Sequence, residues 1–330
     1  MSSDDGSGDA PERSGASLTP VPPTAMVVAA PRFDPEAVYK HHYARFRAAL
    51  EAKPFPGFLA AVVDGESFQA TWVAASETEV RAAIIGRHSR ATLTLPKNEQ
   101  AALRHLALLV RLSGRRPVAR LMDLQTNLGF SDPNGSRHEA IAVNGATFVS
   151  VGGVVLALVP TGAASSVPPD PDAGWRALAP VHWHEGRTRA RPIASPPASS
   201  PPPGATIVRT MDGPRGCSPE LCRAGEIPYG MVTVSASGDE THVLVSGRAL
   251  DEGFLLGRYD RCEVGGPEAD ESLSRVHLLV VREGRHIVAV DTASTNGTYL
   301  GDDRVHLQAL TERTRLDLGG VVELTWRTCN

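Results

Sequence analysis

The sequence predicts a mainly β protein made of two tandem β-sandwiches. Short apolar runs separated by turn residues fill residues 56–160 and return in residues 229–330, and a proline-rich stretch lies between them. The chain has 330 residues, enough for two or three domains that each bury a core. A disordered N-terminal tail and one short helix complete the expected fold.

The N-terminal segments have two different patterns. Residues 1–30 are rich in Ser, Pro, Gly and Ala without periodic apolar positions, which is typical of a disordered tail. Residues 31–55 are expected to form a helix, because Asp34 can cap it, Pro35 suits its first position and Pro54 ends it. Its apolar positions recur at helical spacing: Val38, Tyr39, Tyr43, Phe46 and Leu50.

The two β regions resemble each other in strand length and spacing. Residues 56–160 contain runs such as FLAAVVDG, FQATWVAAS and LALLVRLSG, and residues 229–330 contain MVTVSAS, THVLVSG and VHLLVVREG. Such runs with turn signals between them are typical of sandwiches. Residues 161–228 include ASPPASSPPPGA, a composition that favours an extended linker.

Charge and hydropathy exclude several classes of partner. The formal net charge is −4 and the pI is about 6.3, so we expect neither nucleic acid nor a membrane as a partner. The longest apolar stretches, such as VSVGGVVLALVP, are too short to cross a bilayer. The acidic, polar N-terminus lacks the features of a secretory signal. We therefore expect a cytoplasmic protein with reduced cysteines.

Three short motifs in the second β region combine residues that are suited to binding an anion. They are Gly257-Arg258, Ser274-Arg275-Val276-His277 and Thr295-Asn296-Gly297. A guanidinium and a hydroxyl can bind phosphate oxygens, and an amide can hold a peptide backbone. In their order, spacing and expected placement on loops, these motifs closely resemble those of the forkhead-associated (FHA) family.

The resemblance implies a sandwich that binds phosphothreonine peptides on loops at one end. It implies that Arg258 is the main phosphate contact, that Ser274 donates a hydrogen bond to the same phosphate and that Arg275 adds a second charge. Asn296 would hold the peptide backbone beside the phosphothreonine, and Thr295 would line the same loop.

The resemblance gives three further residues an architectural role. Gly257 and Gly297 would allow a positive φ or a close backbone approach. A buried His277 would join two loops by hydrogen bonds and would take no part in catalysis.

Two other interpretations of these motifs remain. Thr-Asn-Gly is a common hairpin signal, and SLSRVH could simply enter a strand. Ser274, His277 and Asp291 could also form a hydrolytic triad, but the chain has no Gly-x-Ser-x-Gly elbow and the serine and histidine are only three positions apart. The binding interpretation explains more of the residues.

A second copy of the pattern occurs upstream. AAIIGRHSRATLTL parallels GFLLGRYDRCEV, and AALRHLALLVR parallels SLSRVHLLVVR. This comparison aligns His105 with His277 and Gly86-Arg87 with Gly257-Arg258. We expect residues 56–160 to be an FHA-like module.

The upstream copy departs from the pattern where a ligand would bind. Ala102 stands at the place of Ser274 and Leu103 at the place of Arg275, while Leu128 separates the asparagine from the glycine of the turn. We expect this degenerate module to have lost phosphate binding and to serve as a scaffold or as an interface for unphosphorylated protein.

The sequence implies neither a metal nor a cofactor. A zinc site would need a second tight cysteine pair, and His41-His42 or VHWHEG resemble ligands only in isolation. No P-loop, dinucleotide or kinase motif appears. Free thiols are the favoured state of the four cysteines, Cys217, Cys222, Cys262 and Cys329.

The expected function is that of a phosphothreonine-peptide-binding adaptor in Ser/Thr kinase signalling, without enzymatic activity. Its partners would be Ser/Thr-phosphorylated proteins and a Ser/Thr kinase. Thr19 or Thr24 of its own tail, once phosphorylated, could also occupy the site at a high effective concentration. The alternative is a phosphate-independent assembly protein that uses both sandwiches as interaction modules.

Overall fold

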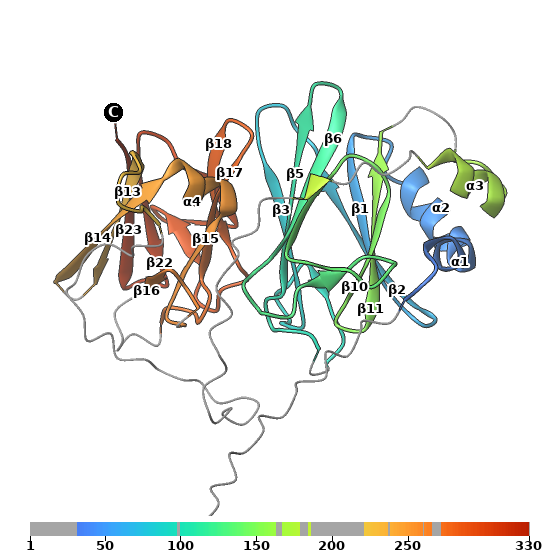
Figure 1. The fold of residues 1–330 in the computed structure, drawn as a ribbon, viewed down its shortest axis with the longest axis horizontal. Helices are drawn as coiled ribbons and strands as arrows, with labels where there is room; N and C mark the ends of the chain where they lie inside the picture. The colour runs from blue at the N-terminus through green and yellow to red at the C-terminus, as the bar shows by residue number, and fades with distance from the viewer. Residues whose placement is uncertain are drawn as a thin grey trace, which may run out of the picture.

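The computed structural model describes residues 32–97, 100–162, 167–178, 184–185, 221–236, 238–259, 261–265 and 272–329. The expectations for residues 1–30, for Thr19 and Thr24, for Cys217 and for most of the linker fall outside these ranges. Figure 1 shows two β-sandwiches side by side, with β17 and β18 of the second next to β3 and β5 of the first. The mainly β class with two tandem sandwiches is confirmed.

The first module, coloured from blue to yellow-green in Figure 1, is built from two sheets. One has the strand order β2-β1-β11-β10-β7-β8, and the other has the order β12-β9-β6-β5-β3-β4. The strands are β1 (Gly57–Asp64), β2 (Ser67–Ala74), β3 (Arg81–Gly86), β4 (Leu93–Thr94), β5 (Leu106–Ser113), β6 (Arg116–Asp123), β7 (Phe130–Ser131), β8 (Arg137–His138), β9 (Ala140–Val143), β10 (Thr147–Val151), β11 (Val154–Thr161) and β12 (His184–Glu185).

The second module repeats this plan. Its sheets have the orders β14-β13-β23-β22-β19-β20 and β16-β15-β17-β18-β21. The strands are β13 (Pro228–Ala236), β14 (Asp239–Ser246), β15 (Phe254–Gly257), β16 (Val264–Gly265), β17 (Leu278–Glu283), β18 (His286–Asp291), β19 (Thr298–Leu300), β20 (Asp303–Val305), β21 (Leu307–Ala309), β22 (Arg313–Leu318) and β23 (Val322–Thr328).

Strand for strand, β1 to β11 correspond to β13 to β23. Both modules pair their first strand with their last, and both add one short parallel strand, β4 beside β3 and β16 beside β15. The internal repeat that the sequence predicts is therefore confirmed as a repeat of topology. Each module has its own core: Phe58, Leu108 and Leu156 belong to the first, and Phe254, Leu324 and Trp326 to the second.

The helices differ from the expectation of one helix over 31–55. The segment forms α1 (Pro35–His41), which Asp34 caps as expected, and α2 (Tyr43–Glu51). The helix is interrupted at His42. The ring of this residue is buried, and its Nε2 forms a hydrogen bond with the carbonyl oxygen of Gly65 at 3.0 Å. This hydrogen bond to the β1–β2 turn holds both helices against the outer face of the first module.

Two further helices were not expected. In the region assigned to the linker, α3 (Pro171–Ala177) begins at the capping residue Asp170 and packs Trp175 against Tyr39 of α1, with 5.7 Å between the ring centroids. In the second module, α4 (Gly247–Glu252) lies between β14 and β15. An Asp-Pro start does precede α3, but its seven residues are too few to show a helical period.

A third apolar cluster joins the two modules. It combines residues of β3, β5 and β6 with residues of β15, β17 and β18, and all of them are buried: Ile84, Ala107, Leu109, Met122, Leu255, Leu279, Val281, Val288 and Val290 belong to it. The central strands of these sheets therefore have one face in a module core and the other in the module interface. This is why β5 and β17 are continuous apolar runs instead of alternating ones. In the described part of the chain, no helix is long and apolar enough to span a membrane.

Candidate functional site

The predicted site residues of the second module lie on three neighbouring loops. Arg258 follows the end of β15, Ser274 and Arg275 precede β17, and residues 292–297 join β18 to β19. A side chain at Gly257 would place its Cβ only 2.4 Å from the carbonyl oxygen of Arg275. Glycine therefore allows the first two loops to run side by side.

His277 connects the second loop to the third from a fully buried position. Its Nδ1 accepts the backbone N–H of Ser274 at 3.2 Å, so the ring proton lies on Nε2, which donates to the carbonyl oxygen of Gly297 at 3.1 Å. Burial lowers the pKa of His277 to about 4, and the ring is therefore neutral at neutral pH.

The serine of the second loop also contacts the third. The Ser274 hydroxyl oxygen accepts the backbone N–H of Thr295 at 2.8 Å. Among the residues that the structure describes, this hydroxyl makes no other hydrogen bond, so its own hydrogen is free for a ligand. The side chain is 6% exposed, and a group that binds there would be largely shielded from water.

The third loop is shaped by the Asp291 carboxylate. It accepts the N–H of Ser294 at 2.8 Å, the hydroxyl of Ser294 at 2.5 Å and the hydroxyl of Thr298 at 2.8 Å. The loop thus leaves the side chains of Thr295 and Asn296 on the surface, and Asn296 Nδ2 donates to the carbonyl oxygen of Ser272 at 2.9 Å.

This geometry does not support the hydrolytic alternative. Both ring nitrogens of His277 are bonded to backbone groups, so the ring cannot take the proton of Ser274. Asp291 is engaged by the third loop, and its carboxylate lies 4.0 Å from the ring. A triad requires a serine–histidine hydrogen bond, which these residues do not make.

The charges around the site suit an anion. Arg258 is exposed and Arg275 is half-buried, and neither forms an ion pair with a carboxylate within the described residues. Arg104 of the first module lies close enough to Arg275 for the two charges to repel each other. Two guanidiniums without ion pairs in the described part of the chain therefore lie near a hydroxyl and an exposed amide, a set of groups that is chemically suited to an anion.

The first module keeps the framework of these loops. His105 Nε2 bonds to the carbonyl oxygen of Gly129 at 2.9 Å, and its Nδ1 accepts the N–H of Ala102 at 3.3 Å. Asp123 accepts both the N–H and the hydroxyl of Thr126, as Asp291 does from Ser294. The two sites therefore share an architecture and differ in their surface groups.

Those surface groups are the ones that a ligand would contact. Ala102 offers no hydroxyl, and Leu128 is 41% exposed at the position that Asn296 occupies in the second module. Within the ranges that the structure describes, the Nε of Arg87 is buried without a hydrogen-bond partner. The first copy thus has the apolar residues Ala102, Leu103 and Leu128 where the second has Ser274, Arg275 and Asn296.

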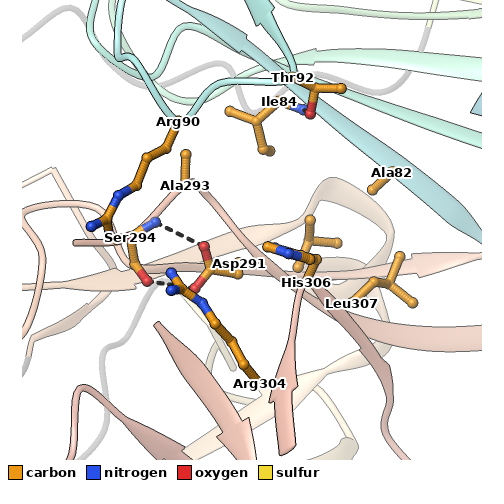
Figure 2. Close-up of a pocket in the computed structure, with 11 residues that line it drawn as sticks. Ala82, Ile84, Arg90, Thr92, Asp291, Ala293, Ser294, Arg304, His306 and Leu307 are labelled. Atoms are coloured by element: carbon orange, nitrogen blue, oxygen red, sulfur yellow. Dashed lines mark hydrogen bonds between the residues drawn. The ribbon is translucent and has the colours of Figure 1, made fainter. Parts of the chain in front are cut away.

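The third loop also contacts residues of the first module, which the motifs of the second module could not predict. A cavity of about 630 Å³ lies between the modules, and Figure 2 shows Arg90 of the first module beside Ser294, with Arg304 and His306 nearby on the second. Arg90 and Arg104 of the first module both donate hydrogen bonds to this loop. Their only signal in the sequence is their position beside degenerate motifs.

The cysteines and other candidate ligands are dispersed. Cys222 and Cys262 are half-buried, Cys329 is an exposed free thiol, and Cys217 is outside the described residues. Across the described ranges, His, Cys, Asp and Glu side chains form no group of three or more that could hold a metal ion.

Several solved structures are similar to this chain. FHA-1 of Rv1747 from Mycobacterium tuberculosis is 27% identical, with 31% of this chain and 99% of that chain covered and a TM-score of 0.26. Slr1951 from Synechocystis sp. is 15% identical, with 31% and 99% covered and a TM-score of 0.27. The FHA domain of CT664 from Chlamydia trachomatis is 21% identical, with 31% and 99% covered and a TM-score of 0.24.

No curated protein matches the chain. The family model of the FHA domain matches residues 254–324, which run from the start of β15 into β23 and include all three loops. Because this match covers the three motifs and the strands that carry them, the second module of this chain belongs to the FHA domain family.

Proposed function

We propose that the second module binds phosphothreonine-containing peptides and that the protein is a non-catalytic adaptor in Ser/Thr kinase signalling. The observation that carries this proposal is the convergence of Arg258, the free hydroxyl of Ser274 and the exposed Asn296 on three contacting loops. The FHA family match over the same residues supports it.

The residue types suit the parts of such a ligand. A phosphate group carries a charge of about −1.5 to −2 and needs charged or hydroxyl donors to replace its lost water. Arg258 and Arg275 supply the charge, and Ser274 supplies a shielded hydroxyl. Asn296 has both a donor and an acceptor for the peptide backbone beside the phosphothreonine, and Thr295 lines the same edge.

The partners follow from the ligand. A phosphothreonine is the product of a Ser/Thr kinase, so the partner is a protein that such a kinase has phosphorylated. The exposed side chains of Thr295 and Asn296 are polar, which fits an extended peptide segment as the ligand. In this proposal His277 acts only by holding the loops, because both of its nitrogens are occupied.

The test is calorimetric titration of the full chain with a phosphothreonine peptide selected from a degenerate library. We expect binding of the phosphorylated peptide and none of the unphosphorylated one. Arg258→Ala should weaken binding about ten- to hundredfold, because a charge-assisted hydrogen bond contributes roughly 1.5–3 kcal/mol. A phosphoserine peptide should bind more weakly, as the family resemblance implies.

Arg313→Ala is the matched control. Arg313 is also an exposed arginine of the second module, and it is the first residue of β22. The other end of β22 is the one near the site, since the N–H of Gly319 donates to the carbonyl oxygen of Gly297 in the third loop. Its loss should leave affinity unchanged. Equal affinity of wild type and a folded Arg258→Ala variant would overturn the proposal in favour of phosphate-independent assembly.

A further inference from the structure

The third loop of the FHA module, residues 292–297, is fastened to the first module by a buried arginine. Arg104 is 5% exposed, and it donates from Nε to the carbonyl oxygen of Thr292 at 2.7 Å and from Nη2 to that of Ala293 at 2.8 Å. Burial lowers the pKa of Arg104 to about 10, so the guanidinium still carries its charge at neutral pH. Two charged hydrogen bonds therefore hold two adjacent peptide groups.

A second arginine continues this contact along the loop. Arg90, in the loop after β3, donates from Nη1 to the carbonyl oxygen of Ser294 at 2.9 Å and also to that of Thr295. Figure 2 shows Arg90 reaching from the first module toward Ser294. Together the two arginines bind four consecutive carbonyl groups, residues 292 to 295.

The N–H groups of the same loop are held by the second module. Asp291 accepts the N–H of Ser294, and the Ser274 hydroxyl accepts that of Thr295. Backbone carbonyls are therefore bound on one side and N–H groups on the other. What remains free is the edge that presents the side chains of Thr295 and Asn296.

This arrangement is only partly reciprocal. The residue at the position of Arg90 in the second module is Arg261, which donates to the carbonyl oxygen of Gln125 in the matching loop at 3.4 Å. The residue at the position of Arg104 is Val276, which has no donor to offer. Among the described residues, the first module thus donates four hydrogen bonds to backbone carbonyls of the third loop. The second module donates one to the matching loop, from Arg261, and also binds the Gln125 side chain through Glu263.

Further contacts between the modules accompany these hydrogen bonds. The shared apolar cluster packs β5 against β17, and Arg111 forms an ion pair with Glu283 at 2.8 Å across the interface. Arg120 lies 3.8 Å from the same carboxylate. Because buried apolar side chains of both modules form this interface, Arg90 and Arg104 extend from a well-packed part of the first module.

We propose that the first module is a positioning element of the phosphothreonine site, in which Arg90 and Arg104 hold the loop in the conformation that presents Thr295 and Asn296 to the ligand. This inference rests on the proposed function of the second module. It assigns the degenerate copy a task in ligand binding without any ligand contact of its own. Since coupling is reciprocal, peptide binding should also strengthen the association of the modules.

The first test measures phosphothreonine-peptide affinity in the full chain. Arg104→Lys keeps the positive charge but replaces a two-pronged donor by a single ammonium that cannot bind both carbonyls in the same way. We expect a loss of about tenfold for Arg104→Lys and about three- to tenfold for the exposed Arg90→Ala. If the arginines acted only through their charge, Arg104→Lys would bind as wild type does.

Arg111→Ala is the matched control for a weakened interface. Arg111 lies near the end of β5 away from Arg104, so its loss removes an ion pair of the interface without touching the loop. We expect unchanged peptide affinity in this variant. A loss equal to that of Arg90→Ala would show that general interface strength matters, and the positioning role would be rejected.

The second test needs no ligand. Hydrogen exchange of the amides of residues 294–297 should be faster in Arg104→Lys and Arg90→Ala than in wild type and Arg111→Ala, at matched global stability. If wild type failed to bind any phosphothreonine peptide, the proposed function would fall, while exchange would still decide whether the arginines order the loop. The inference would be overturned if amide exchange of residues 294–297 were unchanged in the variants, or if it were faster while phosphothreonine-peptide affinity stayed the same. If Arg104→Lys fails to fold, Arg90→Ala alone provides the test.

Discussion

The hydroxyl oxygen of Ser274 accepts the backbone N–H of Thr295 at 2.8 Å and joins two of the three site loops. The serine thereby has two tasks, since its hydrogen remains free for a phosphate oxygen. Loss of the hydroxyl removes a ligand donor and also leaves the N–H of Thr295 without its partner.

We therefore predict that Ser274→Ala weakens phosphothreonine-peptide binding by about tenfold or more, as much as a charged contact would cost, because two hydrogen bonds are lost. Calorimetry on the full chain measures this. Ser274→Thr keeps the hydroxyl and is the control, with affinity close to wild type. An affinity of Ser274→Ala equal to wild type would show that the hydroxyl contacts no phosphate.

Asn296→Ala should act on the peptide backbone and leave the phosphate contacts in place. We expect weaker binding with preserved discrimination between phosphorylated and unphosphorylated peptide. The side chain also donates to the carbonyl oxygen of Ser272, so its loss removes this contact between the second and third loops as well. Loss of phosphate discrimination in Asn296→Ala would contradict the assigned role.

Two buried histidines should make stability depend on pH. Burial lowers the pKa of both His105 and His277 to about 4, whereas an unfolded histidine titrates near 6.5. Between these values the unfolded chain binds more protons, so the free energy of unfolding falls as pH decreases. The loss at pH 5 relative to pH 8 is on the order of 2 kcal/mol for each histidine. The raised pKa of buried Asp123 partly offsets this.

Denaturant unfolding at pH 8 and pH 5 measures the effect, and nitrogen NMR of the imidazoles identifies its source. Both rings should remain neutral with the proton on Nε2 well below pH 6.5. Titration of His277 near pH 6.5 in the folded chain would contradict the prediction. His277→Ala, which removes the link between two loops, should lower the melting temperature, in contrast to Arg258→Ala on the surface.

The first module is predicted not to bind phosphate. Ala102 and Leu128 leave Arg87 without the neighbouring donors that would offset phosphate desolvation. Titration of the full chain with phosphothreonine peptide should give one site per chain. Arg87→Ala should leave affinity and stoichiometry unchanged, whereas Arg258→Ala, at the equivalent position, should not. A second phosphate-dependent site would refute this.

The N-terminal tail could supply an internal ligand. Thr19 and Thr24 each lie close to prolines in the sequence SLTPVPPTAM. A tethered phosphothreonine would compete with external peptide through its effective concentration. We predict that a chain phosphorylated at these positions binds external peptide more weakly than the Thr19→Ala, Thr24→Ala chain treated with the same kinase. Equal affinity would remove this mode of self-inhibition.

The sequence by itself determined the features that depend on nearby positions. Strand runs with turn signals indicated two sandwiches, and the spacing of Gly257, His277 and Gly297 indicated the loop framework, because each contact is made within one module. The same locality made the upstream copy visible, since its His105 and Gly129 keep the framework bond after the polar groups are gone. The short helices were not predicted, because a segment of seven residues such as α3 shows too little periodicity.

Only the tertiary structure decided how the modules cooperate. Arg90 lies 204 residues from Ser294, and Arg104 lies 188 residues from Thr292, so no local pattern could associate them. The apolar run of β5 is equally consistent with a strand buried inside one domain and with one that also faces a neighbour. The packing of β5 against β17 brings the arginines to the carbonyls of the third loop, because burying both apolar sheet faces together removes them from water.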